Sequence, residues 1–163
     1  MAKTAQEKFY AAWKNSAKAL RVIKKHPELA QDLECFDLAL RSCSGKVVRQ
    51  FIEHGANVNH VERSKASVIT STPLYTAFRY FNVEAAQALL EAGADPFVGD
   101  KIKYLVLDGI HKKPPARLKI MKAIIDAGID INKELEIQDG GRPGYSRRYN
   151  LYAHAANDSA MLK

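Results

Sequence analysis

Cysteine is scarce in this chain of 163 residues, which contains only Cys35 and Cys43. Two cysteines are too few for a disulfide scaffold, and their spacing does not match the paired arrangement of a zinc site. No stretch approaches the roughly 18 consecutive apolar residues of a membrane span, and the N-terminal segment is amphipathic. We therefore expect a cytoplasmic protein with no membrane partner.

The motifs of common enzyme classes are also missing. The chain contains no glycine-rich phosphate loop, H-E-x-x-H, G-x-S-x-G or paired-cysteine motif. Its five histidines are scattered, and its carboxylates do not indicate a general acid and base pair. We expect no enzymatic activity, no cofactor and no metal site.

The composition is that of an ordinary soluble domain, with 47% hydrophobic and 26% charged residues. The net charge of +7 is unevenly distributed, because residues 1–27 carry seven basic and one acidic residue. Residues 28–100 carry six basic and ten acidic residues, and residues 101–163 carry twelve and seven. This asymmetry fits simple solubility, a nucleic-acid ligand or an acidic protein partner.

An internal repeat is the main positive signal. Residues 47–59, 84–96 and 120–132 each combine apolar residues at helical spacing with a glycine and a short polar turn. The glycines Gly55, Gly93 and Gly128 are 38 and 35 residues apart. Glycine suits the left-handed conformation that often ends a helix, so the spacing predicts repeated helical units.

The middle unit has the clearest helix start. Thr72 can cap a helix whose first turn contains Pro73, at the head of the sequence T-P-L-Y-T-A. From Thr72 to Pro96 the chain resembles the ankyrin repeat, with its T-P-L-H-x-A opening helix, second helix and G-A-D-x-N turn. Tyr75 replaces the family's usual histidine, and Phe81 replaces its usual glycine between the helices.

The other units match this pattern less closely. Residues 34–39 occupy the opening position of the first unit, and residues 104–107 supply the first helix of the third. Pro114 and Pro115 interrupt the third unit, because paired prolines cannot lie inside a helix. Residues 150–156 can open a fourth unit. Near the N-terminus, the spacing of Phe9, Trp13, Ala17 and Leu20 predicts one amphipathic helix.

The resemblance implies an all-α solenoid of stacked helix-turn-helix units with finger loops, in a single domain. We expect an N-terminal helical cap at residues 1–33 and a first repeat with a long finger at 34–71. A second repeat follows at 72–101, a third with a long finger at 102–148, and a partial repeat at 149–163.

Function follows from the same resemblance, because ankyrin repeats typically bind proteins through fingers and first helices that form a concave face. Residues 60–71 and 133–148 form fingers longer than the family pattern, which points either to a binding surface or to mobile loops. The expected partner-binding residues are Arg41, Ser42, Arg63, Lys65, Arg79, Tyr80, His111, Lys112, Tyr145, Arg147 and Arg148. Because Arg and Tyr commonly anchor interfaces, we expect an acidic protein partner and an inhibitor, immunity or adaptor role.

Two alternatives stay open. Lys14, Lys18, Arg21 and Lys25 fall along one side of the predicted N-terminal helix, where they form either a solvated face or a nonspecific nucleic-acid contact. The C-terminal unit ends after one helix, so Leu151, Tyr152 and Met161 could support a weak homo-oligomer instead of a monomer.

Overall fold

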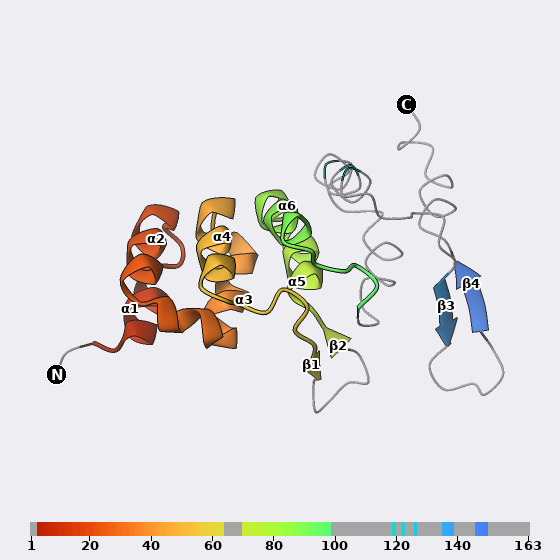
Figure 1. Ribbon diagram of the computed structural model, residues 1–163, viewed down its shortest axis with the longest axis horizontal. Helices are drawn as coiled ribbons and strands as arrows, with labels where there is room; N and C mark the ends of the chain where they lie inside the picture. Colours follow the sequence, from red (N-terminus) through yellow and green to blue (C-terminus); the bar gives the residue numbers. More distant parts are fainter. Residues whose placement is uncertain are drawn as a thin grey trace.

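The computed structural model describes residues 3–63 and 70–98, the single residues 119, 122 and 126, and the segments 135–138 and 146–149. In these residues the chain is helical, as expected, with short strands confined to two hairpin-like pairs. Successive helices pair with each other, and three such pairs stand side by side (Figure 1).

The three pairs have the same construction. The first pair is α1 (Ala5–Ala12) and α2 (Ser16–Lys25), followed by the 3-10 helix η1 (Pro27–Gln31). The second is α3 (Leu33–Ser42) and α4 (Gly45–Glu53), and the third is α5 (Pro73–Arg79) and α6 (Val83–Glu91). α1, α3 and α5 pack in sequence as a first-helix row, and α2, α4 and α6 form a second-helix row.

Local signals set the helix ends as the sequence indicates. The Thr72 hydroxyl accepts a hydrogen bond from the Tyr75 backbone N–H at 3.2 Å, so Thr72 caps α5. Gly55 and Gly93 have φ angles of 91° and 83°, in the left-handed region. The residues after these glycines donate backbone hydrogen bonds five positions back, which completes the predicted helix-terminating motif after α4 and α6.

Phe81, which follows α5, has the left-handed backbone conformation that Gly55 and Gly93 have after α4 and α6. Its φ is 55°, and the next backbone N–H, of Asn82, donates to the Ala77 carbonyl at 2.9 Å. The chain therefore forms the same motif with a bulky residue, although a side chain at positive φ carries a conformational cost.

The prediction of one continuous N-terminal helix is wrong. The chain turns at Trp13–Asn15, and the Asn15 side chain caps a separate helix by accepting from the Lys18 N–H at 3.1 Å. Ala17, expected on the apolar stripe, is exposed, and Lys14 lies in the turn. A residue that caps a helix strongly can outweigh an apolar spacing that also fits a single longer helix.

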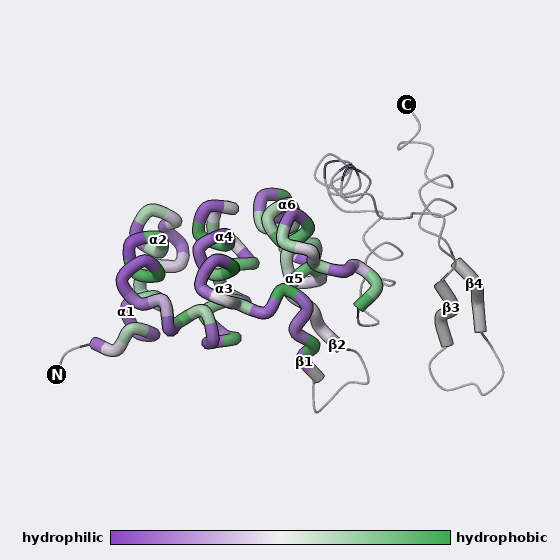
Figure 2. Tube along the Cα trace, in the orientation of Figure 1, coloured by the Kyte–Doolittle hydropathy of each residue, from purple (hydrophilic) through white to green (hydrophobic). Residues whose placement is uncertain are grey.

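The core lies between the helix pairs. Small residues without any exposed surface, Ala19, Ala39, Ala77, Ala85 and Ala86, allow the helices to approach closely. The ring of Phe51 in α4 packs against Phe9 of α1 and Phe36 of α3, with centroid distances of 5.3 and 5.5 Å. Figure 2 shows hydrophobic and hydrophilic residues along every labelled helix, as helices that bury one side require.

Polar contacts connect neighbouring pairs where apolar packing ends. The Asn82 amide donates to the carbonyls of Leu40 and Cys43, at 3.0 and 2.8 Å. The Glu84 carboxylate accepts from the Gly45 N–H at 2.8 Å, where it caps α4 from the following helix pair. Backbone groups at the helix ends of one pair, which lack partners within their own helix, thus bond to side chains of the next pair.

Both expected fingers contain paired strands. β1 (Glu62–Arg63) pairs with β2 (Thr70–Ser71), and β3 (Leu135–Gln138) pairs with β4 (Ser146–Tyr149), both antiparallel.

Lys119, Lys122 and Asp126 are helical and exposed. The other expected features of residues 99–134 and 150–163, including the two prolines and the homo-oligomer residues, lie outside the described residues. The division into caps and repeats stays a prediction.

The Asn82 side chain should contribute more to stability than an ordinary helix cap. Asn82→Ala removes the α6 cap bond to the Ala85 N–H and both bonds to the preceding pair. We expect unfolding free energy to fall by about 2–3 kcal/mol, from about 1 kcal/mol for each bond. Urea unfolding of the full-length chain measures this loss.

Asn15→Ala is the matched control, because Asn15 caps α2 with a single bond to the Lys18 N–H. It should cost about 1 kcal/mol. Equal losses for the two variants would show that the Asn82 bonds to Leu40 and Cys43 contribute nothing.

Both cysteine thiols should be unreactive in the folded chain. Burial raises the pKa of Cys35 to about 12 and that of Cys43 to about 11. Because the reactive form is the thiolate, Ellman's reagent at pH 8 should label neither thiol until denaturant is added. Rapid labelling of the native protein would contradict this burial.

The same raised pKa values predict a stability change at high pH. Between the ordinary thiol pKa and these folded values, the unfolded chain loses thiol protons that the folded chain retains. Unfolding free energy should therefore decrease as pH rises from about 9 to 11. Denaturant titrations of the wild type and of Cys35→Ala across this range test it, and an equal slope in both would exclude Cys35 as a source.

Candidate functional site

Four of the expected partner-binding residues lie at adjoining helix ends. Arg41 and Ser42 close α3, while Arg79 and Tyr80 close α5, and all four are exposed. The Arg41 guanidinium lies 5.1 Å from the centroid of the Tyr80 ring, so the two helix ends are in contact. We refer to these four residues as the Arg41–Tyr80 cluster.

The helices themselves explain why basic residues are favourable here. Arg41 and Arg79 occupy the last turns of α3 and α5, where the partial negative charge of the helix end attracts cations. α3 and α5 pack against each other, and this packing brings their last turns together.

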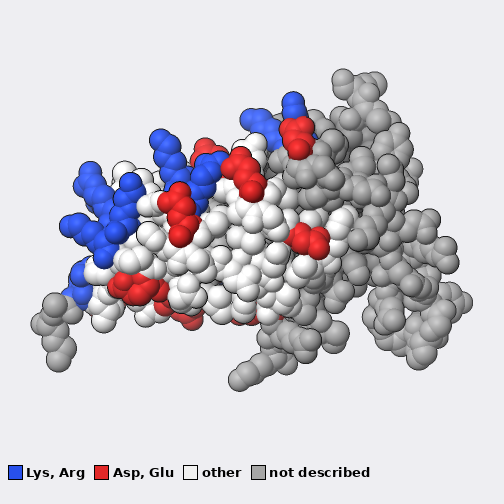
Figure 3. Space-filling view, in the orientation of Figure 1, with Lys and Arg blue, Asp and Glu red and all other residues white. Residues whose placement is uncertain are grey.

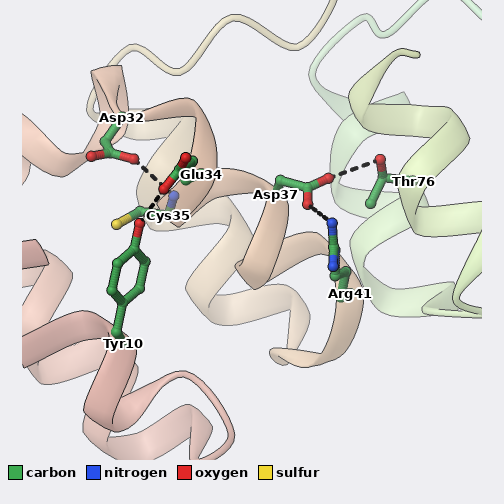
Figure 4. A network of polar contacts seen from close by, with 7 residues as sticks. All are labelled: Tyr10, Asp32, Glu34, Cys35, Asp37, Arg41 and Thr76. Atoms are coloured by element: carbon green, nitrogen blue, oxygen red, sulfur yellow. Dashed lines mark hydrogen bonds and ion pairs between the residues drawn. The ribbon is translucent and has the colours of Figure 1, made fainter. Parts of the chain in front are cut away.

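Arg41 is held in place by a carboxylate one turn away. Its guanidinium forms an ion pair with Asp37 at 2.5 Å, and Asp37 also accepts from the Thr76 hydroxyl at 3.1 Å (Figure 4). The two charged side chains are 41% and 31% exposed, so the pair is open to a partner. This arrangement orients Arg41 and couples α3 to α5.

Arg79 is oriented by a tyrosine of its own helix. Its Nη1 donates to the Tyr75 hydroxyl at 3.2 Å, and this bond is the main cause of a raised Arg79 pKa. Tyr75 stands where the ankyrin pattern has histidine, so its hydroxyl supplies polar contact at that position. Tyr80 leaves 44% of its surface exposed, which is unusual for a large aromatic side chain.

A shallow hollow lies between α3, α5 and the first strand pair. Its cavity volume of about 30 Å³ has room for roughly one water molecule, too little for a cofactor or drug-sized ligand. The hollow is lined by Leu33, Phe36, Asp37, Leu40, His60, Glu62, Ser71, Thr72, Pro73 and Thr76. The volume of this hollow therefore does not support a small-molecule pocket at this position.

The sequence analysis missed the acidic residues of this surface. Glu62 is exposed next to Arg63 in the chain, and Asp37 compensates the charge of Arg41. The surface around these expected basic residues is therefore of mixed charge. Asp37 could have been found from its spacing of four residues before Arg41, since such pairs meet on a helix.

The remaining expected site residues fall in or near the strand pairs. Arg63 lies in β1, and Arg147 and Arg148 lie in β4 opposite Ile137 and Glu136. Lys65, His111, Lys112 and Tyr145 lie outside the described residues. The structure therefore brings together Arg41, Ser42, Arg79 and Tyr80. It does not test whether the other expected residues belong to the same surface.

Another polar contact connects α1 to α3. The Tyr10 hydroxyl donates to Glu34 at 2.5 Å, which ties α1 to α3 and raises the pKa of Tyr10 to about 12 (Figure 4). Among the described residues no three His, Cys, Asp or Glu side chains are grouped as metal ligands, and no helix combines the length and apolarity needed to cross a bilayer.

Comparison with known proteins shows a partial similarity. No family profile matches the chain. A stretch of 54 residues, a third of the chain, is 46% identical to the ankyrin repeat and LEM domain-containing protein 1 homolog of Caenorhabditis elegans. The match spans 7% of the length of that protein. The chain thus contains a segment similar to part of an ankyrin-repeat protein.

Proposed function

We propose that the three helix pairs are ankyrin-type repeats and that the protein is a noncatalytic module that binds another protein. The stacked pairs, the Thr72 cap of α5 and the left-handed glycines after α4 and α6 support the repeat assignment. The partial similarity to an ankyrin-repeat protein supports it independently.

The Arg41–Tyr80 cluster carries the proposal of a binding surface. Arg and Tyr are enriched among the residues that dominate interface energies. Here they are exposed at the ends of adjacent helices and held by Asp37 and Tyr75. Side chains already ordered in the free protein lose less conformational entropy on binding.

The partner chemistry that fits this cluster is an acidic protein surface. Each guanidinium has five N–H donors, so Arg41 and Arg79 keep donors available beyond their bonds to Asp37 and Tyr75. A partner carboxylate can pair with these donors while an apolar group packs on the Tyr80 ring. The finger residues Arg63, Lys65, Tyr145, Arg147 and Arg148, with His111 and Lys112, extend this proposed surface.

A module of this kind acts by occupying or tethering its partner. Binding that covers a partner's working surface inhibits it, and binding that leaves the surface free makes the module an adaptor. An inhibitor, immunity or adaptor role therefore follows from the proposal, and the partner's identity decides among them.

Charge reversal at Arg79 tests the proposed surface. Capture from the native cells with the full-length chain, followed by titration of the recovered partner, should show about tenfold or greater weakening for Arg79→Glu, the scale of an interface anchor. Tyr80→Ser should weaken binding as well, because it removes the exposed ring.

Lys46→Glu is the control, since Lys46 is exposed on α4 in the second-helix row and the charge change is identical. Its partner recovery and affinity should match those of the wild type. The proposal fails if Arg79→Glu and Tyr80→Ser bind the same partner with unchanged affinity.

A further inference from the structure

In the described part of the chain, a group of basic residues without ion pairs lies on and before α2, away from the Arg41–Tyr80 cluster at the ends of α3 and α5. α2 and the turn before it carry exposed basic residues and no acidic residue between them. None of these basic residues forms an ion pair within the described part of the chain. We call them the α2 basic face: Lys14, Lys18, Arg21, Lys24 and Lys25.

The packing of α2 fixes the direction of this face. Ala19 and Ile23 have no exposed surface, and α2 packs on α1, α4 and η1. Lys18, Arg21 and Lys25 recur at intervals of three and four residues, so they share one side of the helix over a rise of about 10 Å. Figure 3 shows basic side chains gathered at this N-terminal end of the stack.

Most other basic residues of the helix pairs are already engaged. Arg49 of α4 pairs with Glu91 of α6 at 2.9 Å, Arg41 pairs with Asp37, and Arg79 donates to Tyr75. The arginines of α3, α4 and α5 are thus partnered, whereas the basic residues of α2 form no ion pair in the described part of the chain.

We propose that the α2 basic face binds the phosphate backbone of nucleic acid without sequence preference. Lysine ammonium groups act as mobile point charges that suit a row of phosphates, and they need no fixed partner geometry. This surface is distinct from the proposed protein-binding cluster, so either function can fail without the other.

Two other polyanionic surfaces fit this face less well. A bilayer requires apolar groups to enter the headgroup region, but the exposed large hydrophobic residues of the described chain, Leu33, Val61 and Tyr80, all lie outside α2. Protein interfaces are depleted in lysine and favour Arg and aromatic anchors, whereas four of the five basic residues here are lysines.

Binding of this kind is driven by the release of counterions from the nucleic acid. The logarithm of the binding constant for duplex DNA falls with the logarithm of salt concentration, with a slope of about −0.9 for each phosphate contact. Three contacts from Lys18, Arg21 and Lys25 therefore make the slope more negative by about 2.7.

Fluorescence anisotropy of a labelled DNA duplex with the full-length chain tests the proposal across about 50 to 200 mM salt. The variant Lys18→Gln, Arg21→Gln, Lys25→Gln should have a slope smaller by about 2–3 and bind at least tenfold more weakly at the lowest salt. Each single Lys→Gln change should reduce the slope by about one, which keeps the test valid if the triple variant unfolds.

The control removes the same net charge at three exposed lysines elsewhere, as Lys46→Gln, Lys119→Gln, Lys122→Gln. It should retain the wild-type slope, with folding of each variant checked by circular dichroism. Absent salt-dependent binding, or equal weakening by both triple variants, overturns the proposal. The proposal is also overturned if the wild type binds a polyglutamate peptide or phosphatidylserine vesicles more tightly than DNA and only the α2 triple variant loses that binding, because the face would then be assigned to an acidic protein or a membrane.

Discussion

The structure depends on one constraint, which is that a single pair of short helices cannot bury its own apolar side. Each pair therefore becomes stable only when a neighbour covers it, and alanines such as Ala39, Ala77 and Ala86 bring the covering helices close. The polar contacts follow the same logic, since Glu84 caps the helix of the preceding pair and Asp37 accepts from Thr76 of the following one. Stability and surface geometry thus depend on the whole stack rather than on any one helix pair.

In this construction the first-helix row and the second-helix row expose side chains of different chemistry. The ends of α3 and α5 present arginine and tyrosine side chains that are ordered by their neighbours, which suits recognition of a defined protein surface. The outer side of α2 presents unpaired lysines, which suit a ligand recognised by charge alone. Among the described helices, Arg41 of α3 and Arg49 of α4 are therefore ion-paired, whereas the basic residues of α2 are not.

Features encoded within a few residues could be predicted from the sequence, and features that depend on distant residues could not. The Thr72 cap and the left-handed Gly55 and Gly93 are local and were predicted correctly. The break before Asn15 is also local, but an apolar spacing that fits one longer helix obscured it. The contact of Thr76 with Asp37 joins residues 39 positions apart, so the hydrogen bond that couples the two helices of the candidate site emerged only with the packing of α3 on α5.

Amide hydrogen exchange of the full-length chain after Leu89→Ala tests the dependence of each pair on its neighbour most directly. Leu89 is fully buried in α6, and α6 packs on α4. The account predicts that amides of α4 lose protection together with those of α6, because removing buried side-chain volume weakens the surface that covers α4. Loss of protection confined to α5 and α6, with α4 unchanged, would contradict it.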